Sequence, residues 1–343
     1  MTVFPGGEKA MKFPIKSILA AAAALVFAAP AAAQLVPGEK EAAIAAIPGV
    51  IAAGAKWDRA WSGPMTADGM TAAADGTLLF AQEQSNSIRR LWLDGREWVL
   101  YPYITGAGAV SVDSAGRIFA VERACSDPGL GQATCAVPSR VVQLAPERKV
   151  LADKFADGKP LGRLNDVLAD GHGGVYWTQG GLYHVSADGT VGIIADKVEK
   201  FTNGLALSPD GKMLYVTDDK KIWAFNVGAD GGTNRRVFAT LSETGGFGGD
   251  GLAVDNDGRL YVTADAGIYV FDKAGKALGV IPVPRRAITL AFAGADRHTL
   301  YVGAMGAETP DGRDWTTPQG VRNVAMTIYK VQMLSAGPAN RPK

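Results

Sequence analysis

The chain has 343 residues, with 35 Lys and Arg against 34 Asp and Glu, so its formal net charge is +1. This near-neutral balance gives no reason to expect nucleic acid or an anionic membrane as a partner. With 47% hydrophobic residues and 43 glycines, the composition is sufficient for one large core and suits an all-β protein with many tight turns.

The N-terminus has the features of a targeting segment. Two lysines flank the start of the apolar run ILAAAAALVFAAP, which ends in three alanines before Gln34. This order predicts residues 1–33 to be an N-terminal extension and signal peptide, cleaved after Ala33. A membrane anchor or a buried helix is the alternative, but the run is short for a bilayer span. We therefore expect a periplasmic or secreted protein.

The chain has two cysteines, Cys125 and Cys135, which enclose the segment SDPGLGQAT. In an oxidising compartment, two cysteines so close together in a loop rich in Pro and Gly predict a disulfide. A pair of reduced thiols is the alternative, and a zinc site is disfavoured because no His or further Cys accompanies them.

A short pattern recurs along the chain. Its copies are DGMTAAADGTLLFA from Asp68, GAVSVDSAGRIFAV from Gly108, NDVLADGHGGVYWT from Asn165, NGLALSPDGKMLYVT from Asn203, DGLAVDNDGRLYVT from Asp250 and TLAFAGADRHTLYVG from Thr289. Each contains two β-rich runs separated by a turn, and most copies lie roughly 40 to 50 residues apart, which is typical of a propeller blade. The sequence therefore predicts an all-β, six-bladed β-propeller with a central metal channel.

The six-blade repeat also indicates the roles of the segments outside it. Residues 34–54 are rich in alanine and predict a short helix or an arm on the surface, and residues 55–343 form the propeller. Closure of a propeller commonly pairs strands from the two termini, so residues 55–62 are expected to complete the blade that contains residues 326–334.

Two insertions interrupt the repeat, one at the cysteine loop and one over residues 304–323. Long loops on a propeller face usually shape a binding site, so both are candidates for its rim. A merely decorative insertion is the alternative.

The first residue of each copy predicts a ring of side chains at one mouth of the channel. In register, these residues are Asp68, Gly108, Asn165, Asn203, Asp250 and Thr289. Two carboxylates and two carboxamides form an oxygen-rich cage of the kind that hard divalent cations take, Ca²⁺ above all. The alternative is that Asp and Asn before Gly are ordinary turn and strand-start residues.

The strings RLNDVLADGHGGVYWT, TNGLALSPDGKMLYVTD and GDGLAVDNDGRLYVTADAGIYVFDKAGKALGVIPVP resemble the gluconolactonase, senescence marker protein and luciferin-regenerating enzyme family of six-bladed propellers. The resemblance implies one central divalent cation, usually Ca²⁺ and in some members Zn²⁺ or Mn²⁺. It implies Asn165, Asn203 and Asp250 as ligands. The family's Glu-Gly-Pro is Asp68-Gly69-Met70 here, so a shorter carboxylate takes the place of the fourth ligand.

The resemblance also implies a substrate-binding role for Arg163, with Asp166 as the partner residue after Asn165. A salt bridge from Arg163 to Asp166 or to another rim acid is the alternative. Glu122 and Arg123 precede the cysteine loop and are further candidates for the substrate-binding mouth, against a rim ion pair. No histidine falls near the ring in this register, so general base work is assigned to Asp250.

These features together predict an exported, metal-dependent hydrolase that acts on a lactone, similar to a gluconolactonase, or on a related ester. Two alternatives stay open. One is an organophosphate-type esterase at the same site, and the other is a non-catalytic periplasmic binding propeller with a structural cation. The expected partner is a small-molecule lactone or ester, with no nucleic acid, no membrane after signal cleavage and no evident protein partner.

Overall fold

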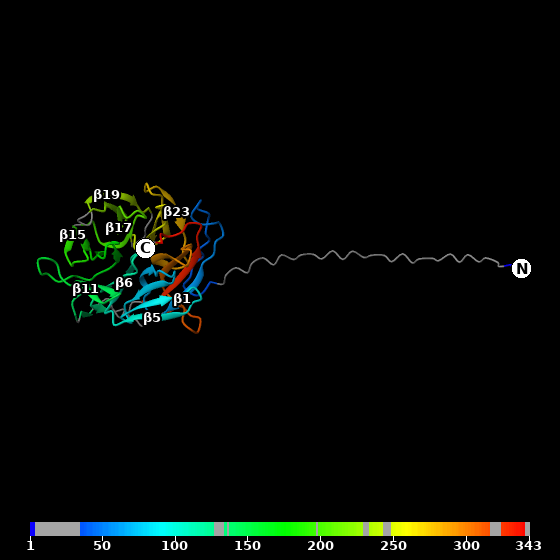
Figure 1. Ribbon diagram of the computed structural model, residues 1–343, viewed down its shortest axis with the longest axis horizontal. Helices are drawn as coiled ribbons and strands as arrows, with labels where there is room; N and C mark the ends of the chain where they lie inside the picture. Colours follow the sequence, from blue (N-terminus) through cyan, green and yellow to red (C-terminus); the bar gives the residue numbers. More distant parts are fainter. Residues whose placement is uncertain are drawn as a thin grey trace. The chain divides into compact units, whose positions relative to one another are not determined.

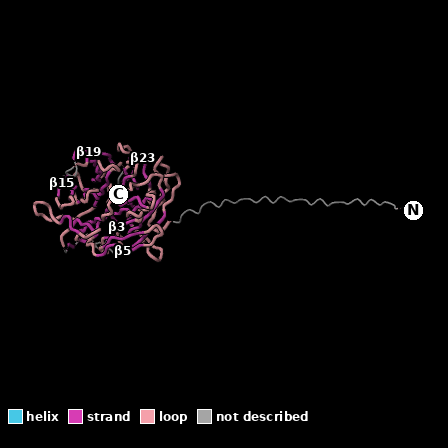
Figure 2. The backbone as a smooth tube through the Cα atoms, viewed as in Figure 1, coloured by secondary structure: helices cyan, strands magenta, loops and turns pink. Residues whose placement is uncertain are grey.

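The computed structural model describes residues 1–3, 35–126, 134–135, 137–196, 198–228, 233–242, 248–315 and 324–339. The chain divides into two compact units, residues 1–34 and 35–343, and the second unit contains all of the described strands. The predicted signal peptide falls almost entirely on residues outside the described ranges. Within those ranges all regular elements are β-strands (Figure 2), and no helix has the length and apolar character needed to cross a bilayer.

The described strands form six four-stranded antiparallel sheets and one two-stranded ladder, as predicted for a six-bladed propeller. From the inner strand outward, the first three blades are β2 (Asp68–Ala72), β3 (Leu78–Gln82), β4 (Ser87–Leu91), β5 (Glu97–Pro102); β6 (Ala107–Val112), β7 (Ile118–Glu122), β10 (Arg140–Ala145), β11 (Lys149–Ala152); and β12 (Val167–Ala169), β13 (Val175–Thr178), β14 (Leu182–Val185), β15 (Val191–Ala195).

The next two blades are β16 (Thr202–Leu207), β17 (Met213–Asp218), β18 (Lys221–Asn226), β19 (Thr233–Thr240); and β20 (Leu252–Val254), β21 (Leu260–Ala264), β22 (Gly267–Phe271), β23 (Ala277–Ile281). The sixth blade is β24 (Arg286–Ala293), β25 (Thr299–Met305), β26 (Met326–Gln332) and β1 (Asp58–Gly63). In Figure 1 the outer strands β5, β11, β15, β19 and β23 lie around the periphery, with β6 and β17 nearer the centre.

The sixth blade closes the propeller as expected from the sequence. Its outer strand β1 comes from the N-terminal side of the chain and pairs antiparallel with β26, with Asp58 opposite Lys330 and Gly63 opposite Met326. Because the first and last parts of the chain share one sheet, the circle is held by main-chain hydrogen bonds and leaves no seam between its ends.

The core lies between neighbouring blades. Most residues of the inner and second strands are buried, and β21 is buried along its whole length, because each sheet is covered on both faces by its neighbours. Blades 2 and 3, for example, share a cluster around Trp177, which is fully buried and stacks on Tyr183. This packing fixes the distance between adjacent inner strands, and therefore the size of the central channel.

The N-terminal arm contains no helix over the described residues 35–54, so the helical alternative is wrong and an arm remains. Instead Ile44, Ile47, Val50 and Ile51 are buried in the cluster between blades 5 and 6. Lys40 donates a main-chain hydrogen bond to Pro284, which ties the start of the arm to the same blades. The alanine-rich composition favours a helix locally, but burial of these isoleucines against the propeller determines the observed conformation.

The direction of the strands decides which loops surround the mouth of the channel. Inner strands begin at the mouth, so the connections between second and third strands, and from each outer strand to the next blade, return to that face. The cysteine loop connects β7 with β10, and the insertion at 304–323 connects β25 with β26. Both insertions are therefore anchored at the predicted rim.

The cysteine loop carries the two-stranded ladder, β8 (Cys125–Ser126) and β9 (Thr134–Cys135), in which Cys125 is directly opposite Cys135. Opposed residues in an antiparallel pair have Cα atoms about 4.5–5.5 Å apart. This spacing falls within the range that a disulfide bridges. The side chains of both cysteines lie outside the described residues, so the disulfide stays a prediction.

Candidate functional site

The residues predicted to form a ring meet at one small cavity on the propeller axis. All six blades contribute to its wall, with residues in their inner strands or directly before them. The wall is lined by Asp68, Gly69, Gly108, Asn165, Asp166, Asn203, Gly204, Asp250, Gly251, Ile288 and Thr289. The centre of a water-sized sphere can move within ≈ 10 Å³ of this cavity. A space of this size holds about one water molecule or one ion.

The repeated Asp-Gly and Asn-Gly pairs are not turns. Asp68-Gly69 and Asn203-Gly204 lie at the starts of their inner strands, where the pairing with the second strand shifts register, between Asp68 and Met70 in blade 1 and between Thr202 and Leu205 in blade 4. Such a bulge re-aims a side chain, here toward the axis. Asp250-Gly251 directly precedes the inner strand of blade 5, whose pairing has no such shift. A Cβ on Gly204 would stand 2.3 Å from the main-chain oxygen of Asp250 in the next blade. Close approach of blades 4 and 5 therefore requires glycine after Asn203.

Buried threonines of the preceding blades hold the ring residues of blades 4 and 5. Thr178 Oγ1 donates to the main-chain oxygen of Asn203 at 2.7 Å, and Thr217 Oγ1 donates to that of Asp250 at 2.8 Å. Gly204 also donates its main-chain N–H to the oxygen of Asp250 at 3.2 Å. The backbone beneath these two side chains is thus fixed by its neighbours, whatever the side chains bind.

The carboxylate of Asp250 accepts no hydrogen bond from any of the described residues. Burial raises the pKa of this carboxyl well above its usual value, and the nearby charge of Asp68 raises it further, while Arg286 and Arg123 act in the opposite direction. The ring therefore contains a carboxylate that lacks a close partner in the described chain and is destabilised in its charged form.

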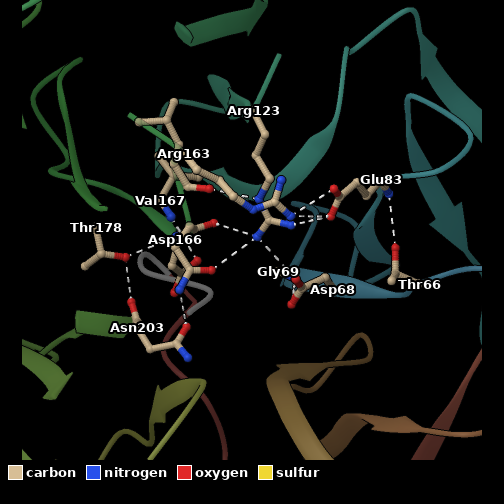
Figure 3. Close-up of polar contacts among 12 residues, drawn as sticks. Thr66, Asp68, Gly69, Glu83, Arg123, Arg163, Asp166, Val167, Thr178 and Asn203 are labelled. Carbon is tan, nitrogen blue, oxygen red and sulfur yellow. Dashed lines mark hydrogen bonds and ion pairs between the residues drawn. The ribbon is translucent and has the colours of Figure 1, made fainter. Parts of the chain in front are cut away.

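The blade 1 and blade 2 side of the ring is organised differently, around the buried guanidinium of Arg123 (Figure 3). Arg123 Nη2 lies 3.4 Å from Asp68 Oδ2 and 3.2 Å from Asn165 Oδ1, and Nε donates to the main-chain oxygen of Leu164 at 2.8 Å. Asn165 Nδ2 in turn donates to Asn203 Oδ1 at 2.6 Å. Arg123 therefore contacts two residues of the ring directly.

Gly108 explains how an arginine fits there. A Cβ at this position would stand 2.3 Å from Arg123 Nε and 2.7 Å from its Cζ. The missing side chain of blade 2 is replaced in space by the guanidinium from the end of the adjacent second strand, β7.

Glu83 is a site residue that the sequence reasoning did not select. Its buried carboxylate accepts from Arg123 Nη1 at 2.7 Å and from Arg163 Nη2 at 2.9 and 3.0 Å (Figure 3). The signal was its position one residue after the second strand of its blade, which is also where Arg123 stands. Aligning the ends of second strands as well as the starts of inner strands would have added Glu83 to Arg123, which was already a candidate.

The other substrate-binding candidates take different places. Arg163 pairs with Glu83 rather than with Asp166, and its side chain is 43% exposed at the mouth. Both oxygens of Asp166 accept main-chain N–H groups, of Val167 and of Leu205, so this carboxylate joins blade 3 to blade 4. Glu122 is buried and pairs with Arg148, away from the contacts of the ring.

The histidines have structural contacts elsewhere. His184 Nε2 lies 2.9 Å from Asp170 Oδ2, and the His184 ring packs at a tilt against Tyr176. His298 Nδ1 faces the main-chain oxygen of Met333 at 3.3 Å. None of the residues lining the axial cavity is a histidine.

The donor set fits a hard divalent cation. Carboxylate and amide oxygens converge on a space of the right size, and a cation there would compensate the charge of Asp250. Three or more His, Cys, Asp or Glu side chains do not cluster as a metal site anywhere in the described ranges. A cation at the ring would therefore depend on the asparagines as well as on the two aspartates.

The chain is similar to proteins of one known family. The SMP-30/Gluconolactonase/LRE-like model matches residues 66–306. A gluconolactonase of Zymomonas mobilis is 28% identical over 187 residues, which cover 46% of this chain and 52% of that protein. The chain thus matches about half the length of this curated relative.

Two solved structures share the fold. A gluconolactonase of Xanthomonas campestris superposes with a TM-score of 0.66 at 21% identity, covering 87% of this chain and 97% of that one. The calcium-binding protein regucalcin of Agrobacterium tumefaciens superposes with a TM-score of 0.59 at 19% identity, covering 82% and 94%. The match to the family model spans the ring and most of the propeller, and the chain therefore belongs to the SMP-30/gluconolactonase/LRE-like family.

Proposed function

We propose that the protein is an exported, divalent-cation-dependent hydrolase of a lactone or a related ester. The observation that carries the proposal is the axial ring of Asp68, Asn165, Asn203 and Asp250 around a space for one ion, in a chain of a family that includes gluconolactonases. Ca²⁺ suits these oxygen donors, and Zn²⁺ or Mn²⁺ is the alternative.

Asp68, Asn165, Asn203 and Asp250 would hold the cation. When bound, the cation would polarise the ester carbonyl and stabilise negative charge that develops on oxygen. Asp250 is the proposed general base, because its carboxylate is next to the cavity and accepts no hydrogen bond from the described chain. One of its oxygens would accept the proton of the attacking water.

Arg163 would orient the substrate at the mouth. Its guanidinium is held by Glu83 on one side and is partly exposed, so it presents a fixed group of donors beside the ring. A hydroxyl or carbonyl oxygen of a lactone is the chemistry that such donors recognise.

The test is proton release on a panel of sugar and aromatic lactones, with and without a chelator. We expect turnover that the chelator abolishes and that divalent cation restores, and an Asp250→Asn variant that loses activity while remaining folded. Asp257→Asn is the matched control, since this exposed aspartate lies in the same blade at the opposite end of the inner strand.

The outcomes separate the alternatives. Turnover that ignores both the chelator and Asp250→Asn would remove the site assignment. A preference for phosphotriesters would favour the organophosphate-type esterase. Retained cation and ligand binding without turnover on any ester would favour the binding propeller.

Export is the second part of the proposal and rests on the signal-like N-terminus and on the opposed positions of Cys125 and Cys135. Intact mass of the protein from a periplasmic extract should correspond to a chain that begins at Gln34. Alkylation before and after reduction should label the two cysteines only after reduction. A chain that keeps its N-terminal residues, or thiols that react without reduction, would contradict the proposal.

A further inference from the structure

The side of the ring next to blade 2 contains a positive charge of its own. Arg123 is buried, and its guanidinium contacts two of the four proposed cation ligands, Asp68 at 3.4 Å and Asn165 at 3.2 Å. An arginine keeps its charge at any ordinary pH. A cation entering the ring would therefore meet a second, permanent cation that already uses part of its ligand set.

The hydrogen bonds show which oxygens are used. A guanidinium can only donate, so the Asn165 atom that faces Arg123 must be the oxygen, and the amide nitrogen must face Asn203 Oδ1, as observed at 2.6 Å. Asp68 accepts from Arg123 through Oδ2 and from the main-chain N–H of Gly69 through Oδ1 at 2.9 Å. Asp250, the other carboxylate of the ring, accepts no hydrogen bond from the described residues.

Glu83 limits this competition. It lies on the far side of the guanidinium, 2.7 Å from Nη1, and so takes up part of its charge. Glu83 also binds Arg163, which leaves it with two cationic partners. Arg123 thus lies between Glu83, which stabilises its charge, and Asp68, which the cation would need as a ligand.

We propose that Arg123, seated in the space above Gly108, acts as a built-in competitor for the divalent cation and sets the affinity of the ring for it. The inference rests on the proposed cation site. Charge and ligand number act in the same direction, because removing the guanidinium removes a repulsion and also releases one oxygen each from Asp68 and Asn165. Glu83 has the opposite effect, because it restrains the competitor.

The experiment is calorimetric titration of Ca²⁺ into the chelator-stripped full chain. Arg123→Met is expected to bind Ca²⁺ about tenfold more tightly than the wild type. Glu83→Gln is expected to bind it several-fold more weakly, since Arg123 then faces Asp68 without a counter-charge. Opposite signs distinguish competition from a purely structural role, in which loss of either partner would loosen the ring and weaken binding.

Arg117→Met is the control for net charge, because Arg117 pairs with Asp113 at the opposite end of the same blade. We expect its Ca²⁺ affinity to equal that of the wild type. A rise equal to that of Arg123→Met would show a long-range charge effect and overturn the proposal.

Gly108→Ala is a second route to the same change, in case Arg123→Met does not fold. Its Cβ would stand 2.3 Å from Arg123 Nε and must displace the flexible end of that side chain. We expect tighter Ca²⁺ binding in the wild-type background and no further change in Arg123→Met. Gly192→Ala is the matched control, since a Cβ in this strand meets no atom closer than 4.0 Å.

Failure of the inference is distinct from failure of the proposed function. Wild type that binds one Ca²⁺, with Arg123→Met equal or weaker, overturns the competition and leaves the cation site intact. Absence of Ca²⁺ binding in the wild type, Arg123→Met and Gly108→Ala overturns both. Binding by Arg123→Met alone supports the competition in its strongest form.

Discussion

The side chains on the two sides of the axial ring are positioned by different contacts. On the side of blades 4 and 5, Asn203 and Asp250 are held through their main chain by Thr178, Thr217 and the next blade. On the side of blades 1 to 3, Asp68 and Asn165 contact the charged side chain of Arg123. On the first side, the main chain is held and the carboxylate of Asp250 accepts no hydrogen bond from the described residues. On the second side, the charge of Asp68 is partly neutralised by Arg123.

This difference indicates a division of roles. A carboxylate whose backbone is fixed and whose oxygens have no donor among the described residues is suited to binding a cation or accepting a proton, because neither requires breaking an existing contact. A carboxylate shared with a guanidinium must give up part of that contact first. Asp250 should therefore matter more to the chemistry than Asp68, although both occupy the same place in their repeats.

The largest expected effect compares these two aspartates directly. Asp250→Asn should lower kcat/KM for the best lactone by about 10²–10⁴, because it removes the proposed base and a ligand together. Asp68→Asn should lower it by only about tenfold, since Arg123 already shares that carboxylate. Steady-state kinetics on both variants measure the ratio, and equal losses would contradict the division of roles.

A second prediction concerns Asp218, which supports the loop before Asn203. Burial opposes ionisation of this carboxyl, but the main-chain N–H groups of Glu199, Lys200 and Phe201 outweigh it and lower its pKa. Asp218→Asn should cost about 2 kcal/mol in the free energy of unfolding at pH 7.

The pH dependence of that loss follows from the sign of the shift. A carboxyl whose pKa is lower in the folded state stabilises the protein above its usual pKa of 3.8, and this contribution disappears as the pH falls through the lowered value. Urea unfolding should therefore show a difference between wild type and Asp218→Asn that is constant near neutrality and shrinks below about pH 4. A difference that grows in acid would show that the ionised carboxylate is not the source of the stability.

The smallest expected effect tests the support beneath Asp250. Thr217→Val removes the hydroxyl that donates to the main-chain oxygen of Asp250, and should weaken Ca²⁺ binding by about tenfold while costing about 1 kcal/mol of stability. Thr217→Ser keeps the hydroxyl and should restore most of the affinity. If valine and serine behaved alike, the hydroxyl would not be what positions the ring, and the contrast between its two sides would lose its basis.

The sequence was sufficient to predict the propeller, its closure by β1 and β26, and the six positions that line the cavity. These follow from a pattern that repeats within each blade, so one register places every copy. Thr289 and Gly108 also line the cavity, so the predicted register is correct even at positions that are not proposed ligands.

The contacts that the sequence did not predict lie between blades, and no single repeat encodes them. Arg123 reaches the ring because Gly108 leaves room, and Glu83 meets it from the neighbouring blade. Asp166 joins two blades through Leu205 for the same reason. The arm at residues 35–54 has a helical composition, and burial of its isoleucines against blades 5 and 6 overrides that preference.

The most direct test of the account is the stoichiometry of Ca²⁺ binding to the stripped wild type and to Asp250→Asn, measured by calorimetry under one set of conditions. We predict one Ca²⁺ per chain in the wild type and no measurable binding in Asp250→Asn, with unchanged thermal unfolding in the absence of cation. One Ca²⁺ bound with equal affinity by both proteins would contradict the assignment of the axial ring as the cation site.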